Sequence, residues 1–246
     1  MLRTLIVAFS FFAALAGYSP YTSAMTGDCT LVMGYSVTRD WFISGGFEAK
    51  TGIVNGEWEM VWDGGASVRK IAYEGRWWAE WDADNIISRC SANARLPSRI
   101  IFHTGYRSDE SGPTAQPILD VVAQIRARIS PTVEIYLMGQ VGSTTPETCD
   151  VFGDNVAAAS IAAIRGAIAA DPTLKEAVHP VVPCSQFADS KGHLSAAGAS
   201  NAATQVAEWV AGLSEPPAPP SLVSCERVAT YSDGSTVSTP RPLEEC

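Results

Sequence analysis

The sequence predicts an α/β fold with a mostly parallel sheet, because short apolar runs alternate with helical patterns. The apolar runs are "TLVM" at 30–33, "RIIF" at 99–102, "VEIYLM" at 133–138 and "AVHPVV" at 177–182. Runs without polar alternation are typical of strands buried on both faces. Strands that alternate with helices form doubly wound sheets, so we expect three layers in a flavodoxin-like arrangement. Ligands of such sheets bind at the carboxyl ends of the strands.

Helices are predicted where apolar residues recur three or four positions apart. The pattern covers residues 118–129 and residues 161–168, the second within an alanine-rich segment opened by Asp154. A last helix begins near Ser195, a residue type that caps helix N-termini, and continues to Leu213.

The N-terminus has the pattern of a signal peptide over residues 1–24. Arg3 supplies the positive charge, residues 4–17 are apolar, and small residues precede a cleavage site near Ala24. The apolar run is shorter than the roughly 20 residues of a membrane span, so a retained anchor is the less favoured alternative. We therefore expect a secreted or periplasmic protein with no membrane span in the mature chain.

The mature chain divides into a large domain, a linker and a small tail. Residues 25–214 are long enough to form one core, and one domain is the default at this length. Prolines make the linker at 215–224 stiff and extended. The tail at 225–246 alternates around Asp233-Gly234, which predicts a small hairpin closed by a disulfide.

The charge of the mature chain argues against nucleic acid as a partner. Removal of residues 1–24 takes one of the 17 basic side chains and none of the 26 acidic ones, which leaves a net charge of −10. Such a surface repels phosphate backbones and anionic lipids.

The cysteines predict disulfides rather than metal ligands. All six follow the signal peptide, and an even count in an exported chain is typical of a disulfide framework. There is no C-x-x-C pair, so the sequence gives no support for zinc. Among the 15 possible pairings, sequence proximity alone favours Cys29–Cys90, Cys149–Cys184 and Cys225–Cys246.

A candidate nucleophile follows the first predicted strand, in "GYS" at 34–36. A serine hydroxyl attacks only when a base takes its proton. His193, in "FADSKGHLSAAG" before the last helix, is the candidate base, and Asp189 on the same loop is the candidate to hold its tautomer. The alternatives are a serine that caps a turn and a histidine on a surface loop.

The two other histidines are weaker candidates. His179 precedes Pro180 inside an apolar run, which favours a packed role. His103 ends the "RIIFH" strand and is the reserve candidate for the base.

Together these motifs resemble the SGNH (GDSL-type) hydrolase superfamily, over about residues 29–213. That family has G-D-S after the first strand and D-x-x-H before the last helix. Here Tyr35 replaces the aspartate, and one more residue separates Asp189 from His193. The α/β-hydrolases are less similar, because Thr38 stands at the second glycine of G-x-S-x-G and the serine lies early. The resemblance implies a Ser-His-Asp esterase that needs no metal or organic cofactor.

The resemblance also implies an oxyanion hole with three donors. The first is the N–H of Ser36. The second is the N–H of a glycine in "WDGGASV", where Gly65 is preferred to Gly64. The alternative is that this Gly-Gly pair forms an ordinary turn. In the third block, "HTGYRSDES", Gly105 fits and Arg107 stands at the family's asparagine. An arginine there donates to an oxyanion, binds an anionic substrate or is a solvated loop charge.

Six of the seven tryptophans lie between positions 41 and 81. Exposed aromatic faces stack on sugar rings, which makes Trp41 a candidate for substrate binding together with Tyr35 and Gly105. The alternative is hydrophobic packing of an irregular region that is poor in strands.

These observations predict a secreted serine esterase for carboxylic esters, with acyl groups on a glycan among the candidate substrates. The alternative is an SGNH-like domain without catalysis that binds a glycan or an envelope partner. A third possibility is acyl transfer to a glycan by the same triad, since only the acceptor differs.

Overall fold

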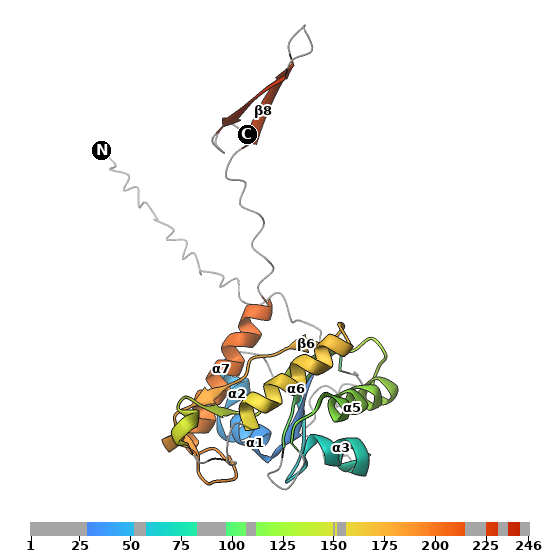
Figure 1. Ribbon diagram of the computed structural model, residues 1–246, viewed down its shortest axis with the longest axis vertical. Helices are drawn as coiled ribbons and strands as arrows, with labels where there is room; N and C mark the ends of the chain where they lie inside the picture. The colour runs from blue at the N-terminus through green and yellow to red at the C-terminus, as the bar shows by residue number, and fades with distance from the viewer. Residues whose placement is uncertain are drawn as a thin grey trace, which may run out of the picture.

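The computed structural model describes residues 29–51, 58–82, 97–106, 112–149, 151, 156–214, 225–230 and 236–241. The large domain is a parallel sheet between two layers of helices (Figure 1). The predicted α/β class and flavodoxin-like layering are therefore confirmed.

Five parallel strands form the sheet, in the order β2-β1-β3-β4-β6. They are β1 (Thr30–Tyr35), β2 (Trp58–Asp63), β3 (Arg99–His103), β4 (Glu134–Met138) and β6 (Lys175–Glu176). β1 lies between β2 and β3, and its six residues are all buried. The carboxyl ends of neighbouring strands meet at one edge, because Tyr35 pairs with Asp63 and Met33 pairs with Phe102.

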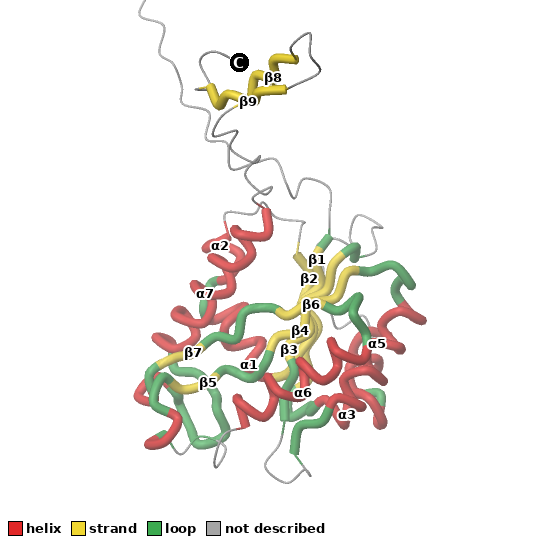
Figure 2. The backbone as a smooth tube through the Cα atoms, turned by 45° about the horizontal axis from the view of Figure 1, so that its top comes forward, coloured by secondary structure: helices red, strands yellow, loops and turns green. Residues whose placement is uncertain are grey.

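Each face of the sheet packs against its own layer of helices (Figure 2). One layer contains α3 (Val68–Glu74), α4 (Arg76–Asp82), α5 (Ala115–Arg128) and α6 (Val156–Ala170). The other contains α1 (Ser36–Arg39), the π-helix η2 (Asp40–Ser44), α2 (Phe47–Thr51) and α7 (Ala196–Ser214). Alternate residues of β1 enter opposite cores, Leu31 and Met33 in one and Val32 in the other, as the two-residue period of a strand requires.

The predicted helices agree with the structure, within a few residues at their ends. α5 covers the pattern at 118–129 and α6 covers the pattern at 161–168. Ser195 caps α7, because its Oγ accepts a hydrogen bond from the N–H of Gly198 at 3.3 Å. Asp154 lies outside the described residues.

The predicted strand at 177–182 is wrong in its extent. β6 ends at Glu176 and pairs with β4, whereas β7 (Val181–Val182) pairs with β5 (Gly142–Ser143) in a separate small sheet. Pro180 has no N–H to donate to a ladder, which explains why one continuous strand does not form.

The tryptophan-rich region is also more regular than the sequence indicated. It contributes the strand β2 and the helices α3 and α4, rather than an irregular segment poor in strands. Its tryptophans supply core residues to both layers, which the sequence composition alone does not reveal.

The disulfide Cys149–Cys184 is present, as sequence proximity predicted, with 5.5 Å between the two Cα atoms. It joins the residue that follows the 3₁₀ turn η4 (Pro146–Thr148) to the first residue of the 3₁₀ turn η5 (Cys184–Gln186). Cys29 is also disulfide-bonded, and its predicted partner, Cys90, lies outside the described residues.

The tail contains an antiparallel pair, β8 (Cys225–Thr230) and β9 (Thr236–Arg241). This pairing fits the predicted hairpin, whose turn at 233–234 and closing Cys246 lie outside the described residues. The same holds for the signal peptide at 1–24 and the linker at 215–224. Within the described ranges, no helix has the length and apolar character to cross a membrane.

Candidate active site

Ser36 lies where β1 ends and α1 begins, at the carboxyl edge of the sheet. The strand before it is buried along its whole length and is flanked on both sides, so the position of the turn is fixed by the core. As the first residue of a helix, Ser36 has no intrahelical acceptor for its N–H. This N–H is therefore suited to donate to a ligand.

A close contact between Gly34 and Thr38 shapes this turn. The hydroxyl of Thr38 accepts a hydrogen bond from the N–H of Tyr35 at 3.0 Å. A Cβ at position 34 would lie 1.9 Å from Thr38 Oγ1 and 2.9 Å from Thr38 Cβ. Glycine is needed at position 34 because the Thr38 side chain occupies that space.

His193 approaches Ser36 from a tight loop that precedes α7. The loop closes on itself through a bridge between Phe187 and Leu194, with a hydrogen bond from the N–H of Ala188 to the carbonyl of His193 at 2.6 Å. The N–H of Ser195 donates to the carbonyl of Gln186 at 2.9 Å. These backbone hydrogen bonds fix the path of the loop at His193.

Three side chains form a chain of hydrogen bonds. Nε2 of His193 lies 3.4 Å from Oγ of Ser36, and Nδ1 lies 3.1 Å from Oδ2 of Asp40. The side chain of His193 is 37% exposed, whereas that of Asp40 is 17% exposed. A carboxylate can only accept, so Nδ1 carries the proton and the lone pair of Nε2 faces the serine hydroxyl.

The carboxylate that orients the ring belongs to Asp40 and not to the predicted Asp189. The Oδ1 atom of Asp189 accepts hydrogen bonds from the N–H groups of Lys191 and His193, at 2.9 and 3.1 Å. Asp189 therefore shapes the loop backbone. Asp40 also accepts from the N–H of Leu194 at 3.1 Å, which ties the π-helix to the His193 loop.

A signal for Asp40 does exist in the sequence. It follows Ser36 by four residues in "SVTRD", and residues four apart share one face of a helix. The structure adds that a π-helical turn starts at Asp40, a feature often found at functional sites. Sequence reasoning missed this residue because it looked for the acid beside the histidine.

The predicted oxyanion glycines lie in the turn after β2. Gly65 has a positive φ of 73°, which glycine adopts at little cost, and the turn follows Asp63, the partner of Tyr35 in the sheet. Arg76 holds this turn through two hydrogen bonds to Asp63, at 2.5 and 2.8 Å. Gly64 and Gly65 are both exposed, and their turn follows β2, the strand that pairs with β1 before Ser36.

Gly105 and Tyr35 pack against each other instead of opening toward a ligand. A Cβ at position 105 would lie 2.5 Å from the Tyr35 ring. Tyr35 is 5% exposed, and burial raises the pKa of its phenol, with further contributions from Asp40 and Tyr106. The predicted contact of Tyr35 and Gly105 with substrate is therefore replaced by packing beneath the site. Arg107 lies outside the described residues.

The reserve histidine, His103, lies in a buried polar cluster on the inner side of α1 and η2. Its Nδ1 contacts the hydroxyl of Thr38 at 2.8 Å and accepts from the indole N–H of Trp41 at 3.2 Å. Because the indole can only donate, Nδ1 is an acceptor and the Thr38 hydroxyl also donates to it. Burial lowers the pKa of His103 to about 3, with a smaller effect of His179 and an opposing hydrogen bond with the backbone of Gly139.

Trp41 is fully buried, so it does not present a face to a substrate. Its ring packs edge-on against the ring of Phe47, with 5.2 Å between the ring centroids. Both rings lie in the core between the sheet and the helices α1, η2, α2 and α7. The other tryptophans of positions 41–81 are buried or partly buried in the two cores: Trp58, Trp62, Trp77, Trp78 and Trp81. These tryptophans therefore serve hydrophobic packing, the alternative to sugar binding that the sequence left open.

His179 also has the packed role that its sequence context favoured. Its Nδ1 accepts the N–H of Gly139 at 2.8 Å, and its Nε2 lies 2.9 Å from Glu176. Among the residues that the structure describes, no group of three or more His, Cys, Asp or Glu side chains is arranged to hold a metal ion.

Comparison of the sequence with family models and with curated proteins finds no match. Comparison of the structure finds a family two carbohydrate esterase from Clostridium thermocellum in complex with cellohexaose and an active-site mutant of such an esterase from the same organism. Each has a TM-score of 0.49 and 10% identity, over 76% of this chain and 64% of that chain. This chain thus spans less than two thirds of their length.

A putative SGNH hydrolase from Slackia heliotrinireducens is similar at a TM-score of 0.45 and 14% identity. The match covers 74% of this chain and 98% of that chain.

Proposed function

We propose that this chain is an exported serine esterase of the SGNH type, with Ser36, His193 and Asp40 as its catalytic triad. The observation that carries the proposal is the continuous hydrogen-bond chain from Asp40 through His193 to Ser36. The 3.4 Å between Nε2 and Oγ is slightly longer than an ideal hydrogen bond, as is common in enzymes without substrate.

The proposed reaction is hydrolysis of a carboxylic ester in two steps. His193 takes the proton of Ser36 as Oγ attacks the carbonyl carbon, and a tetrahedral oxyanion forms. His193 then gives this proton to the alcohol oxygen as its bond to the acyl carbon breaks. In the second step His193 removes a proton from water, which attacks the acyl-serine, and the proton returns to Oγ as the acid leaves.

Two N–H groups are the proposed oxyanion donors, that of Ser36 and that of Gly65. The first lies at the start of α1, and the second lies in the turn that follows the neighbouring strand β2. Removal of one such donor typically costs about 10²–10³ in rate. Asp40 keeps Nδ1 of His193 protonated and so keeps the lone pair of Nε2 directed at the hydroxyl.

Labelling with a fluorophosphonate tests the nucleophile directly. The mature protein is treated with the probe and the modified peptide is mapped. We expect label on Ser36, and no label in the Ser36→Ala and His193→Ala variants while both remain folded by circular dichroism. A folded wild-type protein without label on Ser36 would reject the triad.

The second candidate is an SGNH-like domain that binds a glycan or an envelope partner without catalysis. In the sequence, Tyr35 in place of the family's aspartate and the long Asp189–His193 spacing favour this candidate. Both features carry less weight in the structure, because Tyr35 is buried and the carboxylate of Asp40 contacts Nδ1 of His193. Retained glycan binding by a protein that resists the probe supports this candidate. Acyl transfer is distinguished from hydrolysis by analysis of products in the presence of a glycan acceptor.

Export is proposed from the N-terminal sequence. N-terminal peptide mapping of the protein recovered from a periplasmic or secreted fraction should begin near residue 25. Recovery of residues 1–24 on the mature protein would favour the retained anchor.

A further inference from the structure

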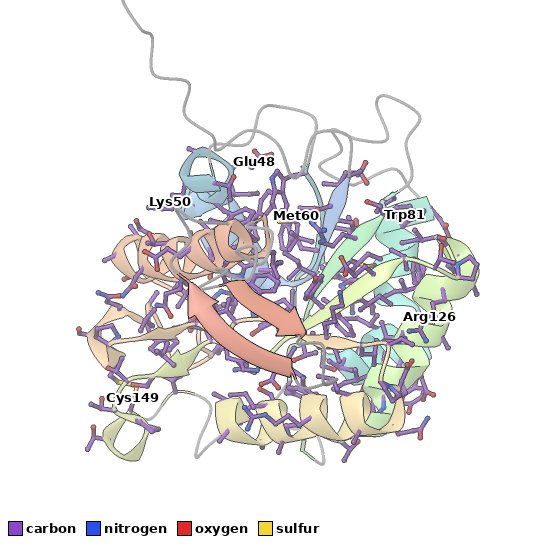
Figure 3. The ribbon with its side chains drawn as sticks, turned by 90° about the horizontal axis from the view of Figure 1, so that it is seen from above. Glu48, Lys50, Met60, Trp81, Arg126 and Cys149 are labelled. Carbon is purple, nitrogen blue, oxygen red and sulfur yellow. A yellow bond between two sulfur atoms is a disulfide. The ribbon has the colours of Figure 1, made fainter. Side chains whose placement is uncertain are left out.

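One short helix, α4, contacts the backbone near both proposed oxyanion donors. It begins at Arg76, directly after Gly75, whose left-handed φ of 67° ends α3. Its place in the fold can be found at the label of Trp81 in Figure 3. The first two residues of this helix, Arg76 and Trp77, each donate a side-chain hydrogen bond to a backbone carbonyl. The proposed triad uses neither of them.

The proposed donor Gly65 lies in a four-residue turn. The turn is closed by a hydrogen bond from the N–H of Ala66 to the carbonyl of Asp63 at 3.2 Å. Gly65 is the third residue of the turn and has a φ of 73°, which is typical of a type II turn. The closing hydrogen bond does not involve the peptide between Gly64 and Gly65. The contacts of the Gly64 carbonyl therefore matter for the direction of the Gly65 N–H.

Arg76 contacts the carbonyl of this peptide. Its Nη2 lies 3.4 Å from the oxygen of Gly64. The guanidinium is anchored by hydrogen bonds of 2.5 and 2.8 Å to Asp63, whose side chain is 11% exposed. The carbonyl and the N–H of a trans peptide point in opposite directions, so the N–H of Gly65 points away from Arg76. A cation at the carbonyl also polarises the peptide and makes its N–H a stronger donor.

A second peptide is held at both of its polar groups just before Ser36. Its carbonyl, that of Gly34, accepts a hydrogen bond from the indole N–H of Trp77 at 2.6 Å. Its N–H, that of Tyr35, donates to Oγ1 of Thr38 at 3.0 Å. Trp77 is fully buried in the core, so its indole has a fixed direction. The plane of this peptide is therefore fixed, and the next N–H along the chain is the donor of Ser36.

The two turns start side by side at the edge of the sheet. Tyr35 and Asp63 are paired at the ends of the neighbouring parallel strands β1 and β2. Such strands lie about 5 Å apart. One oxyanion can accept from both turns only when both N–H groups keep their directions. Because adjacent residues of α4 contact the two turns, this helix links the orientation of one donor to that of the other.

We propose that Arg76 and Trp77 are positioning residues of the oxyanion hole. Arg76 orients and polarises the peptide that carries the Gly65 N–H, and Trp77 fixes the peptide that precedes the Ser36 turn. Both act through the backbone and not by contact with the substrate. This inference rests on the proposed esterase function, because it concerns the same site.

Two neighbouring tryptophans provide a matched pair of variants. Trp77 and Trp78 are both buried, and each donates a hydrogen bond of 2.6 Å from Nε1. The acceptor of Trp78 is the side chain of Gln124 on α5, away from the donors. Replacement by phenylalanine keeps an aromatic ring and removes the N–H. Trp77→Phe should lower kcat for p-nitrophenyl acetate about tenfold with KM changed less than twofold, as loss of one hydrogen bond predicts. Trp78→Phe should leave kcat within twofold, although both variants lower the midpoint of urea denaturation by similar amounts.

Two arginines provide a second pair. The side chains of Arg76 and Arg128 are 38% and 44% exposed. Each forms an ion pair that involves α4, Arg76 with Asp63 and Arg128 with Asp82. Arg76→Met should lower kcat about ten- to a hundredfold, which is less than the loss of a whole oxyanion donor. Arg76→Lys keeps a cation beside the carbonyl and should recover most of this loss. Arg128→Met, the control, should leave kcat within twofold.

A trifluoromethyl ketone tests the oxyanion directly. Oγ of Ser36 adds to the carbonyl carbon and His193 takes the hydroxyl proton, so the adduct has an oxyanion in place of the ketone oxygen. Its inhibition constant should rise in Arg76→Met and Trp77→Phe by about the factor by which kcat/KM falls. The inhibition constant should not change in the two controls. A general distortion of the substrate site would raise KM instead.

The outcomes separate this inference from the esterase proposal. A kcat within twofold of the wild-type value in Arg76→Met or Trp77→Phe overturns the role of that residue, and equal losses in the controls overturn both roles. Fluorophosphonate labelling of Ser36 then leaves the esterase proposal intact. A folded wild-type protein that neither reacts with the probe at Ser36 nor hydrolyses the ester overturns the esterase proposal and this inference together.

Discussion

Two histidines contact opposite sides of the short segment formed by α1 and η2, and their surroundings differ. His193 lies on a loop with its side chain 37% exposed, with a carboxylate at Nδ1 and a serine hydroxyl at Nε2. His103 is completely buried, and its Nδ1 accepts from Thr38 and Trp41. The same side chain is thus arranged as a proton-transfer group at the surface and as a neutral acceptor in the core.

The comparison shows that the partner at Nδ1 decides the role of each ring. An acceptor at Nδ1 leaves Nε2 free to take a proton, which is the arrangement at His193. Two donors at Nδ1 place the proton of the neutral ring of His103 on Nε2, and burial opposes a second proton. The two sites are coupled, because Thr38 binds His103 and caps the turn that presents Ser36.

The largest expected effect distinguishes the two aspartates near His193. Asp40→Asn should lower kcat by about 10³–10⁴-fold, because an amide at Nδ1 favours the wrong tautomer of the imidazole. Asp189→Asn should cost less than about tenfold, because an amide oxygen still accepts from the loop N–H groups. Steady-state kinetics on p-nitrophenyl acetate measures both, and the reverse ranking would restore Asp189 as the orienting acid.

The second prediction separates the histidines by stability. His103→Leu leaves the buried hydroxyl of Thr38 and the indole N–H of Trp41 without their acceptor, so the free energy of unfolding should fall by about 2–4 kcal/mol. His193→Leu, at the more exposed position, should change it by less than about 1 kcal/mol and yet abolish activity. Urea denaturation measures the difference. Equal destabilisation by the two variants would contradict the assigned roles.

The fold and part of the site were predictable from the sequence because their signals are local. A continuous apolar run such as residues 99–102 predicts a buried strand, and Ser36 and His193 each stand beside such an element. The acid was not predictable in the same way. Asp40 and Asp189 are both near a candidate residue in sequence, and only the path of the chain shows which carboxylate faces the ring.

The role of the tryptophans also became clear only from their packing in the structure, because their number in the sequence does not determine it. A dense group of tryptophans is compatible with a sugar-binding surface or with a core, and the sequence does not state which face of each ring is covered. Trp77 is buried in the core on one face of the sheet, whereas Trp41 and Trp58 are buried in the core on the other face.

A smaller effect is expected from Thr38→Val, which keeps the shape of the side chain and removes its hydroxyl. The N–H of Tyr35 then loses its partner, while Nδ1 of His103 keeps Trp41. We expect a loss of about 1–2 kcal/mol in the free energy of unfolding. Because the Ser36 turn is capped by this hydroxyl, kcat should also fall, with KM nearly unchanged. Thr38→Ser, which restores the hydroxyl, should recover kcat, and a failure of this recovery would show that the coupling between the clusters is absent.

The pH dependence of stability gives the finest test of the comparison. The pKa of His103 is about 3 in the folded protein, below its ordinary value of 6.5. The unfolded state therefore binds one more proton than the folded state between these two values, so the contribution of His103 is complete above about pH 6.5 and is lost as the pH falls toward 3. The expected slope is at most about 1.4 kcal/mol per pH unit.

Urea denaturation from pH 7 to pH 5 should show this slope, and His103→Gln should flatten it, because glutamine does not titrate and still offers an acceptor to Trp41. If His103→Gln and the wild-type protein lose stability in parallel, His103 is not the buried neutral group that the geometry indicates.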